Sequence, residues 1–332
     1  MYSAGWYFRL SRFFREKFGE KVYKVPLDAG FTCPNRDGKI SQTGCIYCYN
    51  PSFSPAAIAQ EESSHQISVR EQISNYQCRL EQKNAYRRPG KLSGIQSESK
   101  SQSNFVPQHK YLAYFQSYSN TYAPVPYLRQ IYEEALYTPG VIGLSVATRP
   151  DCLNEEVLDL LGDYAAHYHI WLELGVQSAH DRTLRFINRG HDFECFAKAV
   201  REAYKYGLYT CTHIINGLPG ESHEDMIQTV RYLNELPLQG IKFHQLQVIK
   251  GTPLEKLYDE GNIEILSRDD YLGIVCDQLE VLRPDIVVQR LIGEVYSNEW
   301  LIVPRWEEFR GTFAQAVEKE LHRRGTHQGI IQ

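Results

Sequence analysis

Short apolar runs alternate with amphipathic stretches along the middle of the chain. Five runs rich in β-forming residues, each next to a stretch with helical apolar spacing, cover residues 110–116, 141–148, 169–176, 208–215 and 240–249. An earlier run over VYKVPLDAG brings the number of expected strands to six. Strands alternating with helices are typical of a parallel sheet, so the pattern predicts an α/β fold built as a partial (βα)6 TIM-like barrel. In such barrels the chemistry lies at the carboxyl ends of the strands.

The two ends of the chain depart from this rhythm. Residues 1–22 predict an amphipathic helical extension, because aromatic residues recur there among arginines and lysines. Residues 251–332 predict a mainly helical C-terminal extension around a short strand at VVQRLIG. Residues 23–250 remain as the α/β core. Within it, residues 87–106 are rich in Ser, Gln, Lys and Gly and predict a flexible surface insertion.

Composition narrows the class of protein. The chain has 332 residues, 42% of them hydrophobic, and a net charge of −4, so no global basic field indicates nucleic-acid binding. No apolar run is long enough to span a bilayer, and the first residues lack the apolar core of a secretory signal. We therefore expect a cytoplasmic protein without a membrane partner, in which thiols stay reduced.

Three of the eight cysteines lie close together in one loop. Cys33, Cys45 and Cys48 occur in FTCPNRDGKISQTGCIYCYN, directly after the first expected strand. Three thiolates can hold a four-iron cluster and leave one iron open to another ligand, whereas four would saturate it. The alternative is a structural zinc site completed by Cys78 or His65, although neither has a partner at motif spacing. Spacing alone leaves both kinds of metal site open.

A series of sequence blocks resembles the YhcC-like radical S-adenosylmethionine (SAM) proteins, which are related to the superfamily of the Elongator catalytic subunit, MiaB and NifB. The blocks run from KFGEKVYKVPLDAGFTCPNRDG and GCIYC through LSVATRPDCL, LELGVQSAHDRTLRFINRGH and HIINGLPGE to VQRLIG. The resemblance implies a [4Fe–4S] cluster on Cys33, Cys45 and Cys48, with SAM as the second cofactor. It also implies that reduction cleaves SAM to a 5′-deoxyadenosyl radical. The twelve-position step from Cys33 to Cys45 replaces the usual C-x3-C spacing and is this family's own variant.

The resemblance also implies which residues surround SAM. Tyr47, between the last two cysteines, would lie beside the adenine, and Gln116 and Ser117 stand where many relatives have the Gly-Gly turn that receives the SAM amino group. Alternation along a strand puts Glu173 and Gln177 on one face. They would contact the SAM ribose or methionine, with a structural polar network as the alternative.

Three further motifs complete the expected site. Arg189 in INRGH would pair with the SAM carboxylate, because arginine suits bidentate recognition, or would form a surface ion pair. Arg149 and Cys152, after the third core strand, would face the substrate, although a buried structural thiol is the simpler interpretation of Cys152. The adenine would also contact the loop GLPGE, with Gly217, Pro219, Gly220 and Glu221.

The substrate follows least directly from the sequence. The Elongator-like and MiaB-like relatives suggest RNA, and a tRNA base in particular, while a protein or a small molecule remains open. A radical SAM enzyme needs an electron donor such as flavodoxin or ferredoxin. The non-enzymatic alternative is a zinc-stabilised binding protein.

Overall fold

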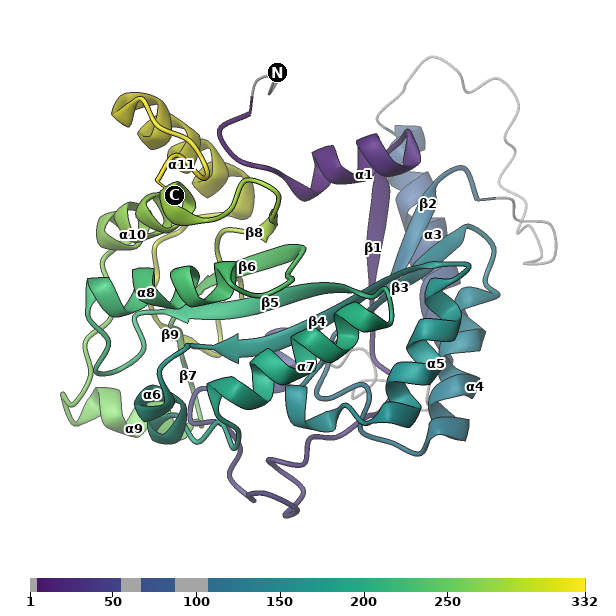
Figure 1. The fold of residues 1–332 in the computed structure, drawn as a ribbon, viewed down its shortest axis with the longest axis horizontal. Helices are drawn as coiled ribbons and strands as arrows, with labels where there is room; N and C mark the ends of the chain where they lie inside the picture. The colour runs from purple at the N-terminus through teal and green to yellow at the C-terminus, as the bar shows by residue number, and fades with distance from the viewer. Residues whose placement is uncertain (1–4, 55–66, 87–106, 332) are drawn as a thin grey trace.

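Seven parallel strands form one curled sheet in the computed structural model, which describes residues 5–54, 67–86 and 107–331. Their order is β1-β2-β3-β4-β5-β6-β8, so each strand lies beside its neighbour in the chain and the sheet remains open between β1 and β8 (Figure 1). The predicted half-barrel is confirmed, and the VVQRLIG run supplies its seventh strand. The strands are β1 (Val22–Leu27), β2 (Lys110–Phe115), β3 (Val141–Thr148), β4 (His169–Gln177), β5 (Tyr209–Asn216), β6 (Gly240–Gln245) and β8 (Val287–Arg290).

Helices follow most strands and cover the outer face of the sheet, with α4, α5 and α7 in front in Figure 1. Several of them begin at a side chain that accepts a backbone N–H, such as Asn154 before α5 and Asp192 before α7. The helices are α1 (Leu10–Phe18), α3 (Val69–Tyr86), α4 (Val125–Leu136), α5 (Glu155–Ala165), α6 (Asp181–Phe186), α7 (Phe193–Lys205), α8 (His223–Asn234), α9 (Pro253–Asp259), α10 (Arg268–Val281) and α11 (Arg310–Arg324), with short 3-10 turns η1 (Asn50–Ser52) and η3 (Pro150–Cys152).

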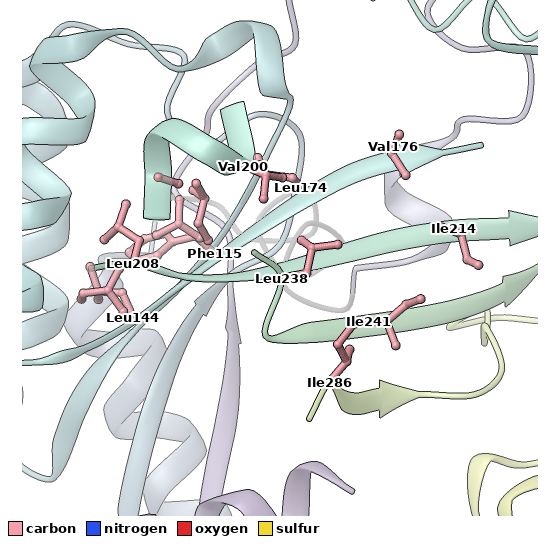
Figure 2. Close-up of a cluster of buried hydrophobic side chains, with 14 of the residues drawn as sticks. Phe115, Leu144, Leu174, Val176, Val200, Leu208, Ile214, Leu238, Ile241 and Ile286 are labelled. Carbon is pink, nitrogen blue, oxygen red and sulfur yellow. The ribbon is translucent and has the colours of Figure 1, made fainter. Parts of the chain in front are cut away.

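The core lies between the sheet and these helices. β4 is buried along nearly its whole length, as expected for a central strand of a parallel sheet whose two faces are covered. Leu144, Leu174 and Val200 belong to the large buried apolar cluster that holds strands and outer helices together (Figure 2). Because this packing fixes the strands, their carboxyl ends form a stable frame for side chains.

Two expected elements differ from the sequence prediction. The run 240–249 is not one strand: β6 ends at Gln245, and a short β7 (Val248–Ile249) pairs antiparallel with β9 (Leu301–Val303). The amphipathic run PRWEEFRGTFAQAVEKELHRR predicts a last helix from Pro304, but that helix begins at Arg310. Arg305 donates to the carbonyls of Leu301 and Ile302 at 2.7 and 3.1 Å, which holds the preceding segment outside the helix.

Helix α1 closes the amino-terminal end of the barrel. Its Phe13 ring lies 5.7 Å from the Trp171 ring and 5.8 Å from the Tyr209 ring, at the starts of β4 and β5. The residue before the helix, Arg9, forms a parallel bridge with Val288 of β8. The predicted N-terminal amphipathic helix therefore packs at the amino-terminal ends of the strands and contacts both edge strands of the sheet, β1 and β8.

No helix in the described part of the chain has the length and apolar character needed to cross a membrane. The predicted insertion 87–106 and the alternative zinc ligand His65 both lie outside the described residues.

Candidate active site

A cavity of ≈ 240 Å³ opens at the carboxyl ends of the strands, where the barrel pattern predicted the chemistry. Its wall combines the loop after β1 with the ends of β2 to β6 and of β8. We call it the strand-end cavity. Its lining includes all three cysteines of the expected ligand set, Cys33, Cys45 and Cys48.

The cysteine loop is fastened to the turn that follows α6. Asn188 donates from Nδ2 to the carbonyl oxygen of Gly44 at 2.7 Å, and Asn35 donates to the carbonyl oxygen of Asn188 at 2.7 Å. The backbone N–H of Ile46 donates to Ile187 at 3.1 Å. Asn188 has a φ of 52°, a region that asparagine tolerates better than most residues. The INRGH motif therefore holds the loop in place.

Arg189, the next residue, lies against one of the thiols. Its Nη1 is 3.6 Å from Cys45 Sγ, and its Nη2 donates to the carbonyl oxygen of Gly175 at 2.5 Å. Burial by itself raises the pKa of the Cys45 thiol, but the positive charges of Arg189 and Arg149 outweigh burial and bring this pKa below its usual value. The environment of Cys45 thus favours the thiolate, which is the form that binds a metal.

Cys48, on the other side of the loop, lies in an environment that disfavours the thiolate. Burial, together with the negative charge of Cys45, raises the pKa of Cys48 to about 12, while Arg36 acts in the opposite direction. Asn50 directs its Nδ2 at Cys48 Sγ at 3.7 Å, and its Oδ1 accepts from the backbone N–H of Tyr118 at 3.1 Å. Asn50 therefore connects the cysteine loop with the segment after β2.

Glu173 lies fully buried in the barrel interior, at the inner end of the strand-end cavity. One carboxylate oxygen accepts from Lys24 and from Ser145 Oγ, the latter at 2.5 Å; the other accepts from Lys242 and His213, with His213 Nε2 at 2.9 Å. Burial by itself raises the pKa of this carboxyl, but the two lysines hold it well below its usual range. Glu173 is therefore an ionised anchor for cations from several strands.

Burial and mutual repulsion lower the pKa values of two basic groups around Glu173. Burial lowers the pKa of Lys242 to about 7, with Glu173 acting against it and Lys24 and Arg290 adding repulsion. Burial and the Lys242 charge likewise lower the pKa of His213 to about 4. His213 is thus neutral at pH 7, and the interior holds positive charge mainly on its lysines and arginines.

The structure brings together several of the residues singled out in the sequence. The strand-end cavity is lined by Tyr47, Gln116, Arg149, Glu173, Gln177 and Arg189, along with the three cysteines. Gln177 reaches it through a left-handed φ of 76°, beside an irregularity in the pairing of β4 with β5.

Other predicted residues lie outside this lining. Ser117 is buried and donates to Ser54 at 2.9 Å, and Glu221 accepts from Ser178 Oγ. Burial and the nearby Asp151 carboxylate raise the pKa of the Cys152 thiol to about 12, at the end of η3. The GLPGE residues Gly217, Pro219 and Gly220 line neither this cavity nor any other described one.

Three cations that no sequence motif pointed to face the same interior: Lys24 of β1, Lys242 of β6 and Arg290 of β8. A signal was present, since both lysines interrupt apolar runs and an unpaired charge is costly to bury. What the sequence lacked was the curl of the sheet, which brings strands β1, β6 and β8 together.

Comparison with protein families agrees with this geometry. Residues 33–233 match the Radical SAM superfamily, and residues 238–323 match the Radical_SAM C-terminal domain. The chain belongs to the radical SAM superfamily. It is therefore a radical SAM enzyme, of a class that works with SAM and an iron–sulfur cluster, and the zinc-stabilised binding protein is excluded as its class.

The relatives of this radical SAM chain include the YhcC-like proteins expected from its motifs. It is 39% identical to uncharacterized protein YtqA of Bacillus subtilis over 97% of this chain and 92% of that protein. It is 36% identical to protein YhcC of Escherichia coli K12 over 95% and 92%. At 28% identity it is similar to a tRNA uridine(34) acetyltransferase of Dehalococcoides mccartyi, over 46% of this chain and 34% of that protein.

A solved structure shares the fold. The archaeal Methanocaldococcus infernus Elp3 with an N-terminal deletion superposes with a TM-score of 0.63 at 16% identity, over 92% of this chain and 64% of that one. At this identity the likeness concerns the radical SAM fold alone.

The side chains of the strand-end cavity fit the two cofactors of the class. Three thiols line its wall, beside an arginine that favours the thiolate form of Cys45. Arg189 Nε and Arg149 Nη1 are buried donors without an acceptor among the described residues. Buried donors are normally hydrogen-bonded, so these two N–H groups suit a carboxylate-bearing ligand or the sulfurs of a cluster.

Proposed function

We propose that this radical SAM enzyme cleaves SAM with a [4Fe–4S] cluster held by Cys33, Cys45 and Cys48. The observation that carries the proposal is that all three side chains line one cavity, whereas Cys78 lies exposed on α3. When bound, the cluster supplies the electron that breaks a C–S bond of SAM, which yields methionine and a 5′-deoxyadenosyl radical able to abstract a hydrogen atom.

The protein's own part in this proposal is to bind and orient. Arg189 pairs with the SAM carboxylate, since its Nε lacks an acceptor in the described chain. Tyr47 lies beside the adenine, and Gln116 and Gln177 supply polar contacts to the amino acid and ribose. The partners of Glu173 favour the alternative of a structural polar network, because both of its oxygens already accept from protein groups.

The roles of the residues farther from the cysteines belong to the same proposal. Arg149 faces the substrate from the cavity wall, with Cys152 behind it. The SAM amino group is received near Ser117, and the GLPGE loop, residues 217–221, supports the adenine from the end of β5. These roles come from the family resemblance.

The test is anaerobic reconstitution with iron and sulfide, followed by reduction with dithionite in the presence of SAM. We expect wild-type protein to bind iron and to release 5′-deoxyadenosine. Cys48→Ala should lose both, while Cys78→Ala, which replaces an exposed cysteine, should keep both. Zinc in place of iron in anaerobically purified protein, or iron binding by Cys48→Ala equal to wild type, would overturn the proposal.

We propose RNA, and tRNA in particular, as the substrate class to test first. The similarity to a tRNA uridine(34) acetyltransferase supports it, over less than half of each protein. The measurement is a comparison of modified nucleosides in tRNA from wild-type and deletion strains. An unchanged profile would count against RNA and favour a small-molecule or protein substrate.

The proposed reaction needs a reductant from outside the chain. A low-potential carrier such as flavodoxin or ferredoxin suits a cluster that must reduce SAM. The cytoplasm, where thiols stay reduced, is the compartment that suits an enzyme with three metal-binding cysteines.

A further inference from the structure

A second cavity, of ≈ 440 Å³, lies at the open side of the half-barrel, between β1 and β8. We call it the side cavity. The two cavities adjoin, because five residues line both of them: Phe53, Tyr114, Gln116, Arg290 and Glu294. The side cavity therefore lies between the strand-end cavity and the open side of the sheet.

Cations dominate the lining of the side cavity. Four of its lining residues carry positive charge, whereas Glu294 is its single carboxylate among the residues that the structure describes; the four cations are Lys24, Lys242, Arg290 and Arg310. They come from β1, β6, β8 and the start of α11. Elements far apart in the sequence therefore direct charge of one sign into one space.

Most of these cations already have an anionic partner. Lys24 and Lys242 both pair with Glu173, which lies just beyond the side cavity. Arg310 pairs with Glu294, with Nε 2.5 Å from Oε2. Each carboxylate near the cavity is thus engaged, and Glu173 is shared by two lysines.

Arg290 is the exception. No carboxylate lies within ion-pair distance of its guanidinium in the described chain. Its side chain is half-buried, and the residue lines both cavities. Its charge adds to the lowering of the pKa values of His213 and Lys242, and after burial it is the main cause that lowers the pKa of Arg310 to about 10. An anion beside Arg290 would relieve this repulsion.

We propose that the side cavity binds an oxyanion group of the substrate, a carboxylate or a phosphate, through the guanidinium of Arg290. A planar guanidinium matches both groups with two parallel hydrogen bonds. The other cations of the lining strengthen the attraction, and the shared wall of the two cavities leaves the rest of the substrate close to the proposed SAM site. That the anion belongs to a substrate rests on the proposed function; the anion site itself does not.

The test measures anion binding by anaerobically purified full-length protein, with inorganic phosphate and succinate as the two probes in calorimetric titrations. We expect saturable binding of at least one probe. Arg290→Met should weaken it about tenfold or more, as expected for loss of a charge-assisted hydrogen-bonding partner. Arg290→Lys should retain part of it. Tighter phosphate binding would indicate a phosphate ester, and tighter succinate binding a carboxylate.

Arg201→Met is the matched control, because Arg201 lies on the outer helix α7 and pairs with Glu194 at 3.3 Å. It should bind the probes like wild type. Binding of neither probe, equal binding by Arg290→Met and wild type, or equal losses in both variants would overturn the anion site. Release of 5′-deoxyadenosine by the wild-type protein is measured separately, so failure of SAM cleavage with Arg290-dependent anion binding intact would reject only the proposed function.

Discussion

At the scale of single residues, Glu173 connects side chains from four strands. It accepts from Lys24 on β1, Ser145 on β3, His213 on β5 and Lys242 on β6. A buried charge is tolerated when it is paired and hydrogen-bonded, and removal of one partner leaves the others uncompensated. The interior of this barrel is therefore sensitive to changes at one carboxylate.

We predict that Glu173→Ala lowers the free energy of unfolding by about 3–5 kcal/mol, because it leaves buried lysine charge without its anion. Urea denaturation monitored by circular dichroism checks this. Glu202→Ala is the control, since its ion pair with Lys205 at 2.7 Å is exposed and is worth about 0–1 kcal/mol. A loss for Glu173→Ala no larger than that of the control would contradict the anchoring role.

A second residue-scale prediction concerns Asn188. Asn188→Ala removes donors to Gly44, Ser41 and Thr43 in the cysteine loop. At about 1–1.5 kcal/mol for the short bond to Gly44, we expect reconstituted protein to lose iron to a chelator roughly five- to tenfold faster. Asn154→Ala removes a helix cap outside the loop and should leave the rate unchanged. Equal rates of iron loss in both variants would argue against the fastening of the loop by INRGH.

At the scale of elements, α1 closes the end of the barrel at which the strands begin. Its aromatic face packs against His169, which is buried at the start of β4 with its ring 5.7 Å from that of Phe13. Burial, assisted by the charges of Lys17 and Lys24, lowers the pKa of His169 to about 3. Protonation of this imidazole is therefore far more favourable in the unfolded chain, where its pKa is about 6.5.

The lowered pKa of His169 makes the stability of the protein depend on pH. Between pH 6.5 and 3 the unfolded chain binds a proton at His169 that the folded chain does not, so stability falls as the pH falls through this window. We predict that His169→Asn makes the loss of stability between pH 6 and pH 5 smaller by about 1 kcal/mol. Denaturant unfolding at both pH values measures it. His167→Asn, at an exposed neighbour, should behave like wild type; identical pH slopes in all three proteins would refute the assignment.

At the scale of the whole molecule, the sequence predicted what depends on local pattern. The parallel strands follow from their apolar runs, and β3 has the bounds that VIGLSVAT predicts. The loop after the first strand was predicted from its flanking residues, and its three cysteines line one cavity. Alternation predicted a shared face for Glu173 and Gln177, and both line that cavity.

What escaped prediction depends on contacts between distant segments. The curl of the sheet brings Lys24, Lys242 and Arg290 into one space, and no local pattern encodes that curl. The end of β6 at Gln245 was missed for a related reason. Leu246 still donates its N–H to Asn216 of β5 at 2.9 Å, but Val248 and Ile249 then pair with β9, a distant segment that no local pattern reveals.

The contacts that hold the segment before α1 join the two ends of the described chain, and these ends are synthesised at different times. Phe8 donates its backbone N–H to Gln328 at 2.7 Å across 320 positions, and its carbonyl accepts from Val288. During translation α1 thus emerges long before Val288 and Gln328, which hold the backbone of the segment preceding it, although Trp171 of β4 and Tyr209 of β5 cover its aromatic face earlier. We therefore expect the attachment of residues 8 and 9 to β8 and to Gln328 to be a late folding event, which follows the synthesis of both segments.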